Sequence, residues 1–566
     1  MRSASAVKYF FISFIFSAFI LNAQTEKYTH FDTLKGSITE QRKWWDVTHY
    51  DLHVAFNYKD SSIIGYNTIT YKVLEKYCST CKLKEPLNIL QIDLIVPLEI
   101  DSVLQDSKRC KWINTGNSIN TGNVYFINVP NPQIINAKNK ITVYYHGKPV
   151  AAKNAPWDGG VIWSKDSLKN PWIAIACQGM AGSAWYPCKD HQYDEPDSSS
   201  LYITAPQDLV TVSNGRLRSK KINADGTATY NWAVVNPINN YNIIPYIGKY
   251  VNFKDTFSGK GGVLDLDFWV MEENLEKAKL QFQQVKPMLR CFENWFGKYP
   301  FYEDGYKLVE APFLGMEHQS AIAYGNKYLN GYKGRDLSAT GWGMKWDFII
   351  VHESGHEWFG NNITVKDVAD NWVHEGFTAY SENLFTESLY GKKAGAEYVI
   401  GTQREIKNDV PVISDYNVNR DGSSDKYYKA SNMLHTMRTI VNNDSLWKAT
   451  LQGLNKTFWH QTVSTKQIED YMISFLKRDL QKIFDQYLRT IKIPELQYKI
   501  SAGKLSYRWS NCVNGFNMPL KTNDGKKDIL LQPTEKWQSI NYKSSIFNAD
   551  ANFYVTTKKV TTEIKK

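Results

Sequence analysis

The sequence lacks long hydrophobic runs after its first 23 residues, and this absence argues against a membrane-spanning helix in the rest of the chain. A helix that crosses a bilayer needs about 20 predominantly apolar residues, and no later segment approaches that length. The stretch from Tyr9 to Leu21 is apolar but short, and it follows two basic residues and no acid. We therefore expect residues 1–23 to be a secretory signal peptide, with an uncleaved anchor as the alternative. The protein is then exported, periplasmic or secreted, and its mature chain has no membrane span.

The chain also lacks any extended run of one charge. Its formal net charge is +10, from 67 Lys and Arg against 57 Asp and Glu, and no basic run is longer than a pair. Spread over 566 residues, this balance is a weak signal for nucleic acid or a membrane surface. No internal repeat or low-complexity tract is present. We predict a globular protein without a nucleic-acid partner.

Cysteine is scarce, with seven in the whole sequence. In an exported protein an odd number leaves at least one thiol unpaired. The spacing Cys78-x-x-Cys81 has no second pair to complete a zinc ribbon, so a local disulfide or two free thiols is favoured there.

The periodicity of apolar residues divides the chain into regions. Residues 44–250 alternate apolar and polar positions, as in Tyr50-Leu52-Val54-Phe56 and Ile64-Tyr66-Thr68, which predicts antiparallel β structure. After residue 250 the spacing becomes three and four residues, which indicates helices. Short alternating runs return after Pro494. We predict a multidomain α+β protein: an N-terminal antiparallel β domain at 24–252, a mainly helical catalytic domain at 253–493 and a small β domain at 494–566.

One motif carries most of the chemistry. His352-Glu353-Ser354-Gly355-His356 is followed, eighteen residues later, by Glu375. On a helix, positions i and i+4 lie about 40° apart, so both imidazoles can reach one metal ion. Two histidines and a glutamate leave the fourth position of a tetrahedral zinc for water, as in catalytic sites. The pattern predicts one zinc ion held by His352, His356 and Glu375, with Glu353 facing the water.

Two helices are predicted to present these residues. The apolar run 348–351 precedes the motif and Gly360 follows it, which predicts a buried helix that stops at Gly360. A second helix is predicted from Trp372 to Tyr390, with Gly391 as its end. Glu382 lies on the same face as Glu375, so we expect it to accept a hydrogen bond from a ligand histidine. A solvated helix glutamate is the alternative.

With its spacing, the motif resembles the zinc aminopeptidase family of aminopeptidase N and leukotriene A4 hydrolase, the gluzincin metallopeptidases. The segments 358–361 and 370–377 share that resemblance. Leu314-Gly315-Met316-Glu317-His318 is similar to the family's GxMEN exopeptidase signature, with Leu314 and His318 in place of Gly and Asn. Gln178 with the stretch 186–190 resembles a glutamine and PCxD element, and residues 427–430 match Tyr-x-Lys-Gly except at the last position.

The resemblance implies a thermolysin-like catalytic domain that removes N-terminal residues from peptides with a free N-terminus. It assigns Tyr427 to the oxyanion that forms during hydrolysis, although sequence alone leaves Tyr428 as a competitor. His318 and His374 stand beside functional glutamates and are not expected to bind metal.

Recognition of the substrate ammonium follows from the same resemblance. A carboxylate beside the metal can pair with an ammonium and fix the scissile bond one residue away. The resemblance places Glu317 there, assisted by Gln178 and Glu375, with Gly315 and Met316 along the substrate. Two alternatives stay open: a zinc endopeptidase on the same site, and an inactive exported peptide-binding protein.

Overall fold

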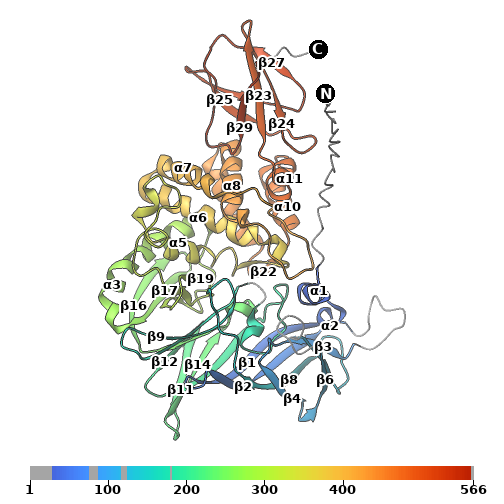
Figure 1. Cartoon of the computed structure of the whole chain (residues 1–566), viewed down its shortest axis with the longest axis vertical. Coiled ribbons are helices and arrows are strands. Elements are labelled where there is room, and N and C mark those ends of the chain that lie inside the picture. Colours follow the sequence, from blue (N-terminus) through green and yellow to red (C-terminus); the bar gives the residue numbers. More distant parts are fainter. Residues whose placement is uncertain (1–27, 76–86, 116–123, 179–180, 562–566) are drawn as a thin grey trace, which may run out of the picture.

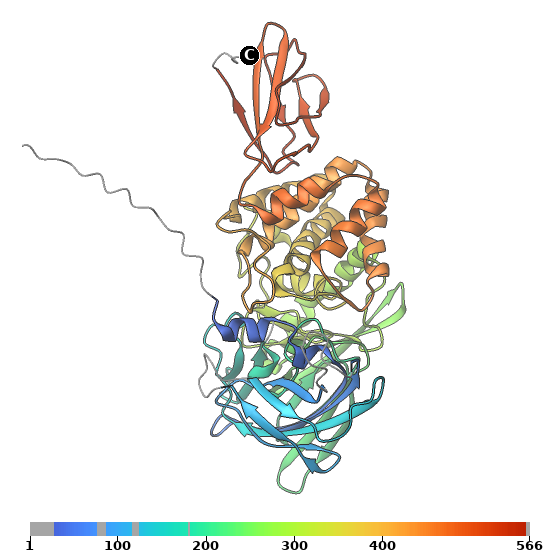
Figure 2. The same cartoon turned by 90° about the vertical axis from the view of Figure 1, so that its right-hand side faces the viewer.

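The computed structural model describes residues 28–75, 87–115, 124–178 and 181–561. These residues form three regions stacked along the long axis: a β-rich N-terminal region, a helical middle and a small C-terminal β region (Figure 1). Figure 2 shows the same stacking after a quarter turn. The predicted multidomain α+β fold class is confirmed. The predicted signal peptide and Cys78-x-x-Cys81 lie outside the described residues.

An eight-stranded sheet dominates the N-terminal region, in the order β13-β14-β11-β1-β2-β8-β4-β5. Two smaller sheets accompany it, ordered β12-β15-β10-β9 and β3-β7-β6, with two short helices before the first strand. The elements are α1 (His30–Gly36), α2 (Glu40–Lys43), β1 (Trp45–Asn57), β2 (Ser62–Val73), β3 (Ile89–Asp93), β4 (Glu99–Gln105), β5 (Lys108–Arg109), β6 (Lys111–Asn114), β7 (Val124–Asn128), β8 (Lys138–Gly147), β9 (Gly160–Lys165), β10 (Pro171–Ala176), β11 (Ser199–Pro206), β12 (Val210–Ser213), β13 (Arg216–Ile222), β14 (Thr227–Val234) and β15 (Pro245–Gly248).

The alternating patterns do form strands, with two differences from the prediction. In β1 the predicted apolar positions are buried, but in β2 Ile64 is 63% exposed while Ile63 and Ile69 face the core. Alternation identifies a strand, but here the outer face also carries apolar residues. The sheet is also not wholly antiparallel, because β1 and β11 pair in parallel. A long connection separates these two strands, so no hairpin forces them to run in opposite directions.

A five-stranded sheet joins the first two regions, in the order β16-β17-β18-β20-β19. Leu308 and Ile322 pack into the helical core, while Val309 and Ala323 pack into the N-terminal core. The sheet is therefore buried on both faces, and its short edge strand β19 is held where the two cores meet. The strands are β16 (Tyr250–Gly259), β17 (Gly262–Met271), β18 (Tyr306–Glu310), β19 (Gly315–Met316) and β20 (Ile322–Tyr324).

The hairpin β16–β17 extends past the residue where the helical domain was predicted to begin. The predicted boundary between 252 and 253 falls inside β16, and the first helix of this region starts at Leu275. Alternating residues of the hairpin, such as Leu264 and Phe268, face the helical core. The β pattern there therefore belongs to the catalytic region.

The middle region is built from helices and one small sheet, β21 with β22. Its predicted helix over 372–390 agrees with α6, and a capping box formed by Ser464 and Gln467 opens α10. The elements are α3 (Leu275–Gln281), α4 (Val285–Phe296), α5 (Phe348–Gly355), α6 (Trp372–Tyr390), α7 (Lys392–Gly401), α8 (Tyr428–Val441), α9 (Asp444–Thr457), α10 (Thr465–Leu476), α11 (Gln481–Arg489), β21 (Ile363–Val365) and β22 (Gln461–Val463).

Helix α5 ends earlier than the sequence predicts. Asp347 caps its N-terminus by accepting from the backbone N–H groups of Ile349 and Ile350, but the helix stops at Gly355 rather than at Gly360. His356 is the C-cap, and its Nδ1 lies 3.0 Å from the carbonyl oxygen of Phe359. The chain turns here to make that contact. Gly360 then adopts φ +133°, which favours glycine.

The C-terminal region consists of two small sheets, ordered β27-β24-β23-β29 and β26-β25-β28. The alternation predicted after Pro494 is present on β24, where Leu505, Tyr507 and Trp509 face inward and join the apolar cluster of the helical region. The strands are β23 (Glu495–Ser501), β24 (Lys504–Ser510), β25 (Leu520–Asn523), β26 (Asp528–Leu531), β27 (Gln538–Asn541), β28 (Asn548–Ala549) and β29 (Thr556–Lys559).

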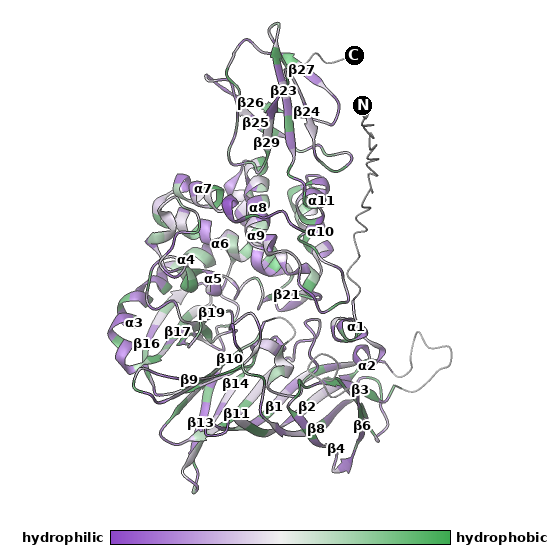
Figure 3. Cartoon of the chain, viewed as in Figure 1, coloured by the Kyte–Doolittle hydropathy of each residue, from purple (hydrophilic) through white to green (hydrophobic). Residues whose placement is uncertain are grey.

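Polar and apolar residues are interspersed along the helices and strands of all three regions (Figure 3). Within the described ranges, none of the helices combines the length and apolar character that crossing a bilayer requires.

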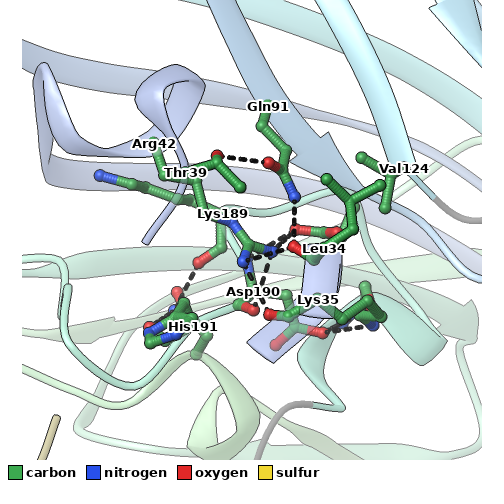
Figure 4. Close-up of polar contacts among 12 residues, drawn as sticks. Leu34, Lys35, Thr39, Arg42, Gln91, Val124, Lys189, Asp190 and His191 are labelled. Atoms are coloured by element: carbon green, nitrogen blue, oxygen red, sulfur yellow. Dashed lines mark hydrogen bonds and ion pairs between the residues drawn. The ribbon is translucent and has the colours of Figure 1, made fainter. Parts of the chain in front are cut away.

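A buried ionic cluster ties the N-terminal helices to the sheet (Figure 4). Arg42 is completely buried; its Nη2 lies 2.6 Å from Asp93 Oδ2, and its Nη1 donates to the Lys35 carbonyl oxygen at 2.7 Å. Nearby, the Asp190 carboxylate accepts from Ser183 Oγ at 2.5 Å. Asp190 thereby fixes the position of Ser183, which follows Gln178 closely in the sequence.

Replacing Arg42 by alanine would leave Asp93 buried without its cation. Removing one partner of a buried pair costs about 3–5 kcal/mol, so we expect Arg42→Ala to reduce the free energy of unfolding by that order in urea denaturation. The control is Lys249→Ala, which removes the exposed partner of Asp208 and should cost no more than about 1 kcal/mol. Equal destabilisation by the two variants would contradict the structural importance of the Arg42 cluster.

Candidate active site

The three predicted metal ligands converge from two helices. His352 and His356 come from α5 and its C-cap, and Glu375 from the first turn of α6. Their ligand atoms all lie within 4.8 Å of one another. Glu375 Oε2 is 3.6 Å from His352 Nε2 and 3.3 Å from His356 Nε2. The structure therefore brings together the set that the motif predicted.

The outer nitrogens of both histidines face hydrogen-bond acceptors. His352 Nδ1 lies 2.8 Å from Glu382 Oε1, and His356 Nδ1 faces the Phe359 carbonyl oxygen. Acceptors at Nδ1 favour the tautomer that leaves the Nε2 lone pair free, the arrangement typical of metal-bound histidines. Glu382 is fully buried and also accepts from Tyr398 Oη at 2.7 Å, so the solvated-glutamate alternative does not describe it.

The donor atoms fit a zinc ion. Glu375 Oε2 is buried and has no hydrogen-bond partner, although it lies between two imidazole nitrogens. A buried carboxylate oxygen beside two free lone pairs is unfavourable without a cation. Two imidazoles and one carboxylate are the ligand types of catalytic zinc.

A cavity of about 350 Å³ opens at this set and includes the remaining predicted residues. Its wall contains all ten residues predicted for the site except Glu382, which lies behind His352. The predicted residues in the wall are Gln178, Gly315, Met316, Glu317, His352, Glu353, His356, Glu375 and Tyr427.

Two glutamates stand beside the predicted metal position. Oxygen atoms of Glu317 and Glu353 and a nitrogen of His356 lie within 4.8 Å of one another. Burial raises the pKa of Glu353 to about 7. Strand β19 packs tightly on α5 here, because a Cβ on Gly315 would come within 3.0 Å of Glu353 Oε1. Glycine at 315 therefore lets the strand lie against the catalytic helix.

Glu317 is held by residues that sequence reasoning missed. Tyr241 Oη donates to Glu317 Oε1 at 3.1 Å, and Asn361 Nδ2 donates to the Glu317 carbonyl oxygen at 2.9 Å. Tyr241 lies in a short 3-10 turn, Asn240–Asn242, between two strands of the N-terminal region. Its only sequence signal is the run of asparagines around it, which indicates a turn and not a site.

Both candidate tyrosines line the cavity, in different surroundings. The ring centroid of Tyr427 lies 5.9 Å from that of His352. Burial and the neighbouring Glu375 carboxylate hold the pKa of Tyr427 well above its usual range, so its phenol stays protonated. Lys426, also missed from sequence, places its Nζ 3.8 Å from Glu375 Oε1 and pairs with Asp421.

The histidines discounted from sequence have other partners. His318 Nδ1 lies 2.8 Å from Tyr246 Oη, and His374 Nε2 accepts from the backbone N–H of Val365 at 2.9 Å. Burial lowers the pKa of each to about 3. The five cysteines in the described ranges are free thiols, and Cys177 and Cys188 are buried.

Three side chains that would hold a zinc ion, a cavity beside them and the Glu353 carboxylate in its wall define the class: a zinc hydrolase site of the His-Glu-x-x-His type. Comparison with known proteins agrees. The family model described as "Peptidase family M1 domain" matches residues 280–487. The chain therefore contains a peptidase family M1 domain, and that family implies a single catalytic zinc.

Similar proteins carry related names. Leukotriene A-4 hydrolase of Xenopus laevis is 22% identical over 356 residues, covering 58% of this chain and 54% of that protein. Leucine aminopeptidase 2 of Vanderwaltozyma polyspora is 22% identical over 459 residues, covering 78% of this chain and 64% of that one. The chain thus spans between about half and two thirds of the length of these curated relatives.

Solved structures show the same fold. A mutant M1 zinc metallopeptidase of Deinococcus radiodurans, bound to the substrate Tyr-Ser-Ala, superposes with a TM-score of 0.65 at 19% identity. That match covers 79% of this chain and 95% of the other. The bacterial protein without the mutation gives a TM-score of 0.63, covering 77% of this chain and 91% of the other.

The hydrogen bond from His352 to Glu382 generates a prediction about metal affinity. Loss of such a partner typically lowers metal affinity about 10- to 100-fold. We expect Glu382→Ala to weaken zinc binding by this factor in competition with a chromophoric chelator, because His352 loses its orientation. Glu276→Ala removes an exposed carboxylate and is the control. Unchanged affinity in Glu382→Ala would contradict the role of this contact.

Proposed function

We propose that this chain is an exported zinc aminopeptidase that hydrolyses the first peptide bond of unblocked peptides. The observation that carries the proposal is the position of Glu317. Its carboxylate is buried, lies within 4.8 Å of the Glu353 and His356 ligand atoms, and accepts from a single phenol, that of Tyr241. A buried carboxylate in this position favours a substrate that brings an ammonium group.

The reaction needs an activated water, a proton carrier and a group that stabilises the oxyanion. Zinc held by His352, His356 and Glu375 would supply positive charge and lower the pKa of water. Glu353 takes a proton from the water while the water oxygen forms a bond to the carbonyl carbon. It then delivers that proton to the nitrogen as the carbon–nitrogen bond breaks. The water is divided between a new carboxyl group and a free amine.

Tyr427 is the proposed donor to the developing oxyanion. Its raised pKa keeps the proton on the phenol, and its ring lies against His352 beside the predicted metal position. A positioned donor of this kind contributes a few kcal/mol to catalysis, at most about 4. Tyr428 lines the same cavity, but after burial the carboxylates that raise its pKa most are Glu382 and Glu405, whereas for Tyr427 the first is Glu375.

The ammonium site combines Glu317 with Gln178, Glu375, Gly315 and Met316. Pairing of the α-ammonium with Glu317 fixes the next carbonyl carbon beside Glu353. The strand residues Gly315 and Met316 form the adjacent cavity wall, where a substrate backbone can lie. An internal stretch of a longer chain brings no cation, so it would leave Glu317 unpaired, which disfavours endopeptidase activity.

Export rests on the sequence of residues 1–23. We expect the mature protein to begin close to Gln24 and to be recovered from the periplasm or medium after expression in a bacterial host. N-terminal sequencing of the recovered protein checks this. A protein retained in the cytoplasm with residues 1–23 intact would contradict the export proposal and leave the activity untouched.

Digestion of a peptide library, half of it N-acetylated, tests the activity. We expect stepwise loss of N-terminal residues from the free peptides alone, abolished by a chelator and restored by zinc, with products read by mass spectrometry. Cleavage at internal bonds would indicate an endopeptidase, and no cleavage a peptide-binding protein.

Two variants in the same assay separate the proposed roles. Glu353→Gln should bind zinc normally and lose turnover by about 10²- to 10⁴-fold, since proton transfer is lost. Glu317→Ala should reduce the preference for free over acetylated peptides, because the ammonium loses its partner. If Glu317→Ala retains the full preference, the assignment of the ammonium site is wrong.

A further inference from the structure

A second cavity of about 790 Å³ adjoins the active-site cavity. Three chain segments line one cavity and then the other: 152–157, 310–317 and 324–335. Leu314 belongs to both walls. The two cavities are therefore neighbours, and the chain that leads into β19 runs along both walls.

The order of residues along that chain gives the second cavity a direction. From the ammonium site at Glu317, the wall runs back through Met316, Gly315 and Leu314 and enters the second cavity at Phe313. A peptide whose first residue is held at Glu317 has its remaining residues on the far side of the scissile bond. If they continue along this wall, they reach the second cavity within a few residues, because an extended chain advances about 3.3–3.6 Å per residue.

The second cavity is basic. Lys153, Lys327 and Lys333 line it, and Glu310 is its one acidic lining residue. The Glu310 carboxylate is already engaged by the backbone N–H of Met271 at 2.8 Å and the side chain of Asn274 at 2.7 Å. The three lysines are exposed, and no carboxylate within the described ranges forms an ion pair with them. Their charges are available to a ligand.

The loop that carries two of these lysines is fixed to the catalytic helix. Asn326 Nδ2 donates to Leu329 O, Gly331 O and Asp347 Oδ1 at 2.8–2.9 Å, and its Oδ1 accepts from the Lys333 N–H at 2.9 Å. Asp347 in turn caps α5, which carries the metal ligands. The side-chain amide of Asn326 thus sets the position of this loop relative to the metal site.

Two further observations describe a loop held in shape. Lys327 and Tyr328 adopt φ +56° and +60°, an unfavourable conformation for residues other than glycine that persists where the surroundings impose it. Lys333 Nζ lies 5.8 Å from the ring centroid of Trp157, which is in the wall of the active-site cavity. The loop that carries Lys327 and Lys333 therefore contacts Trp157, on the segment 152–157, where the two cavities adjoin.

We propose that the second cavity binds a carboxylate on the part of the substrate beyond the scissile bond, through Lys153, Lys327 and Lys333. The enzyme would then prefer short peptides whose free C-terminus, or an acidic side chain, reaches this cavity. The inference rests on the proposed aminopeptidase function and adds a substrate class to it: short carboxylate-bearing peptides.

The test compares free acids with amides. Leucyl peptides with two to five following alanines are prepared with a free C-terminal carboxylate, as C-terminal amides, and as amides ending in glutamate. We expect kcat/KM for release of leucine to be at least about tenfold higher for the acid than for the plain amide at one or more lengths, mainly through KM. Recovery by the glutamate amide shows that a side-chain carboxylate is also accepted, and no recovery restricts the site to the C-terminus.

Charge removal tests the lysines themselves. The variant with Lys153→Gln, Lys327→Gln and Lys333→Gln should reduce the acid-to-amide ratio to about one. The control removes three exposed lysines of the C-terminal region, Lys504→Gln, Lys536→Gln and Lys543→Gln, and should keep the unaltered ratio.

An acid-to-amide ratio of kcat/KM below about twofold at every peptide length, with no increase for the amide that ends in glutamate, overturns the inference. Release of leucine in the same assay would still support the proposed function. If no peptide releases leucine, the proposed function fails on its own. The acid-to-amide ratio of dissociation constants, measured by calorimetry on the uncleaved peptides, then decides whether the cavity binds carboxylates.

Discussion

The close packing of α5 on α6 is the contact on which the site depends. Gly355 lies at this contact, which leaves no room for a larger residue, because a Cβ there would come within 2.7 Å of Ser381 Oγ on the facing helix. This approach brings Glu375 to the two histidines and Glu382 to the outer nitrogen of His352. A larger residue at 355 would separate the helices, and the ligand set would open with them.

The same packing concentrates acidic groups in a dry interior. Glu317, Glu353, Glu375 and Glu382 are all buried within the same group of contacts. Carboxylates this close repel one another unless cations or hydrogen bonds compensate. Lys426, the phenols of Tyr241 and Tyr398, and the predicted zinc ion provide that compensation. The cost of burying the acids is thereby linked to the cations that catalysis requires, a metal ion and a substrate ammonium.

The sequence predicted the residues whose spacing along the chain matches a known zinc-binding pattern. It missed the residues that only the tertiary structure brings to the site. His352, His356 and Glu375 follow from helical periodicity and the preferred ligands of zinc. Tyr241 and Lys426 reach the site from distant segments, and no local pattern marks them. The parallel pairing of β1 with β11 was missed for a similar reason, because these strands are far apart in sequence. The early end of α5 was missed for another reason, since it depends on a local turn in which His356 Nδ1 faces the Phe359 carbonyl oxygen. The basic cavity beside β19 likewise combines segments 152–155 and 324–333, which only the fold brings together.

The central claim is that zinc at His352, His356 and Glu375 works beside an ammonium site at Glu317. The most direct measurement is a crystal structure of Glu353→Gln with zinc and a leucyl tripeptide, recorded at the zinc absorption edge. The account predicts an anomalous peak bounded by the three ligands, and a peptide ammonium about 2.7–3.2 Å from a Glu317 oxygen. A metal ion bound elsewhere, or a peptide whose N-terminus extends past Glu317 with an internal bond at the zinc, would contradict it.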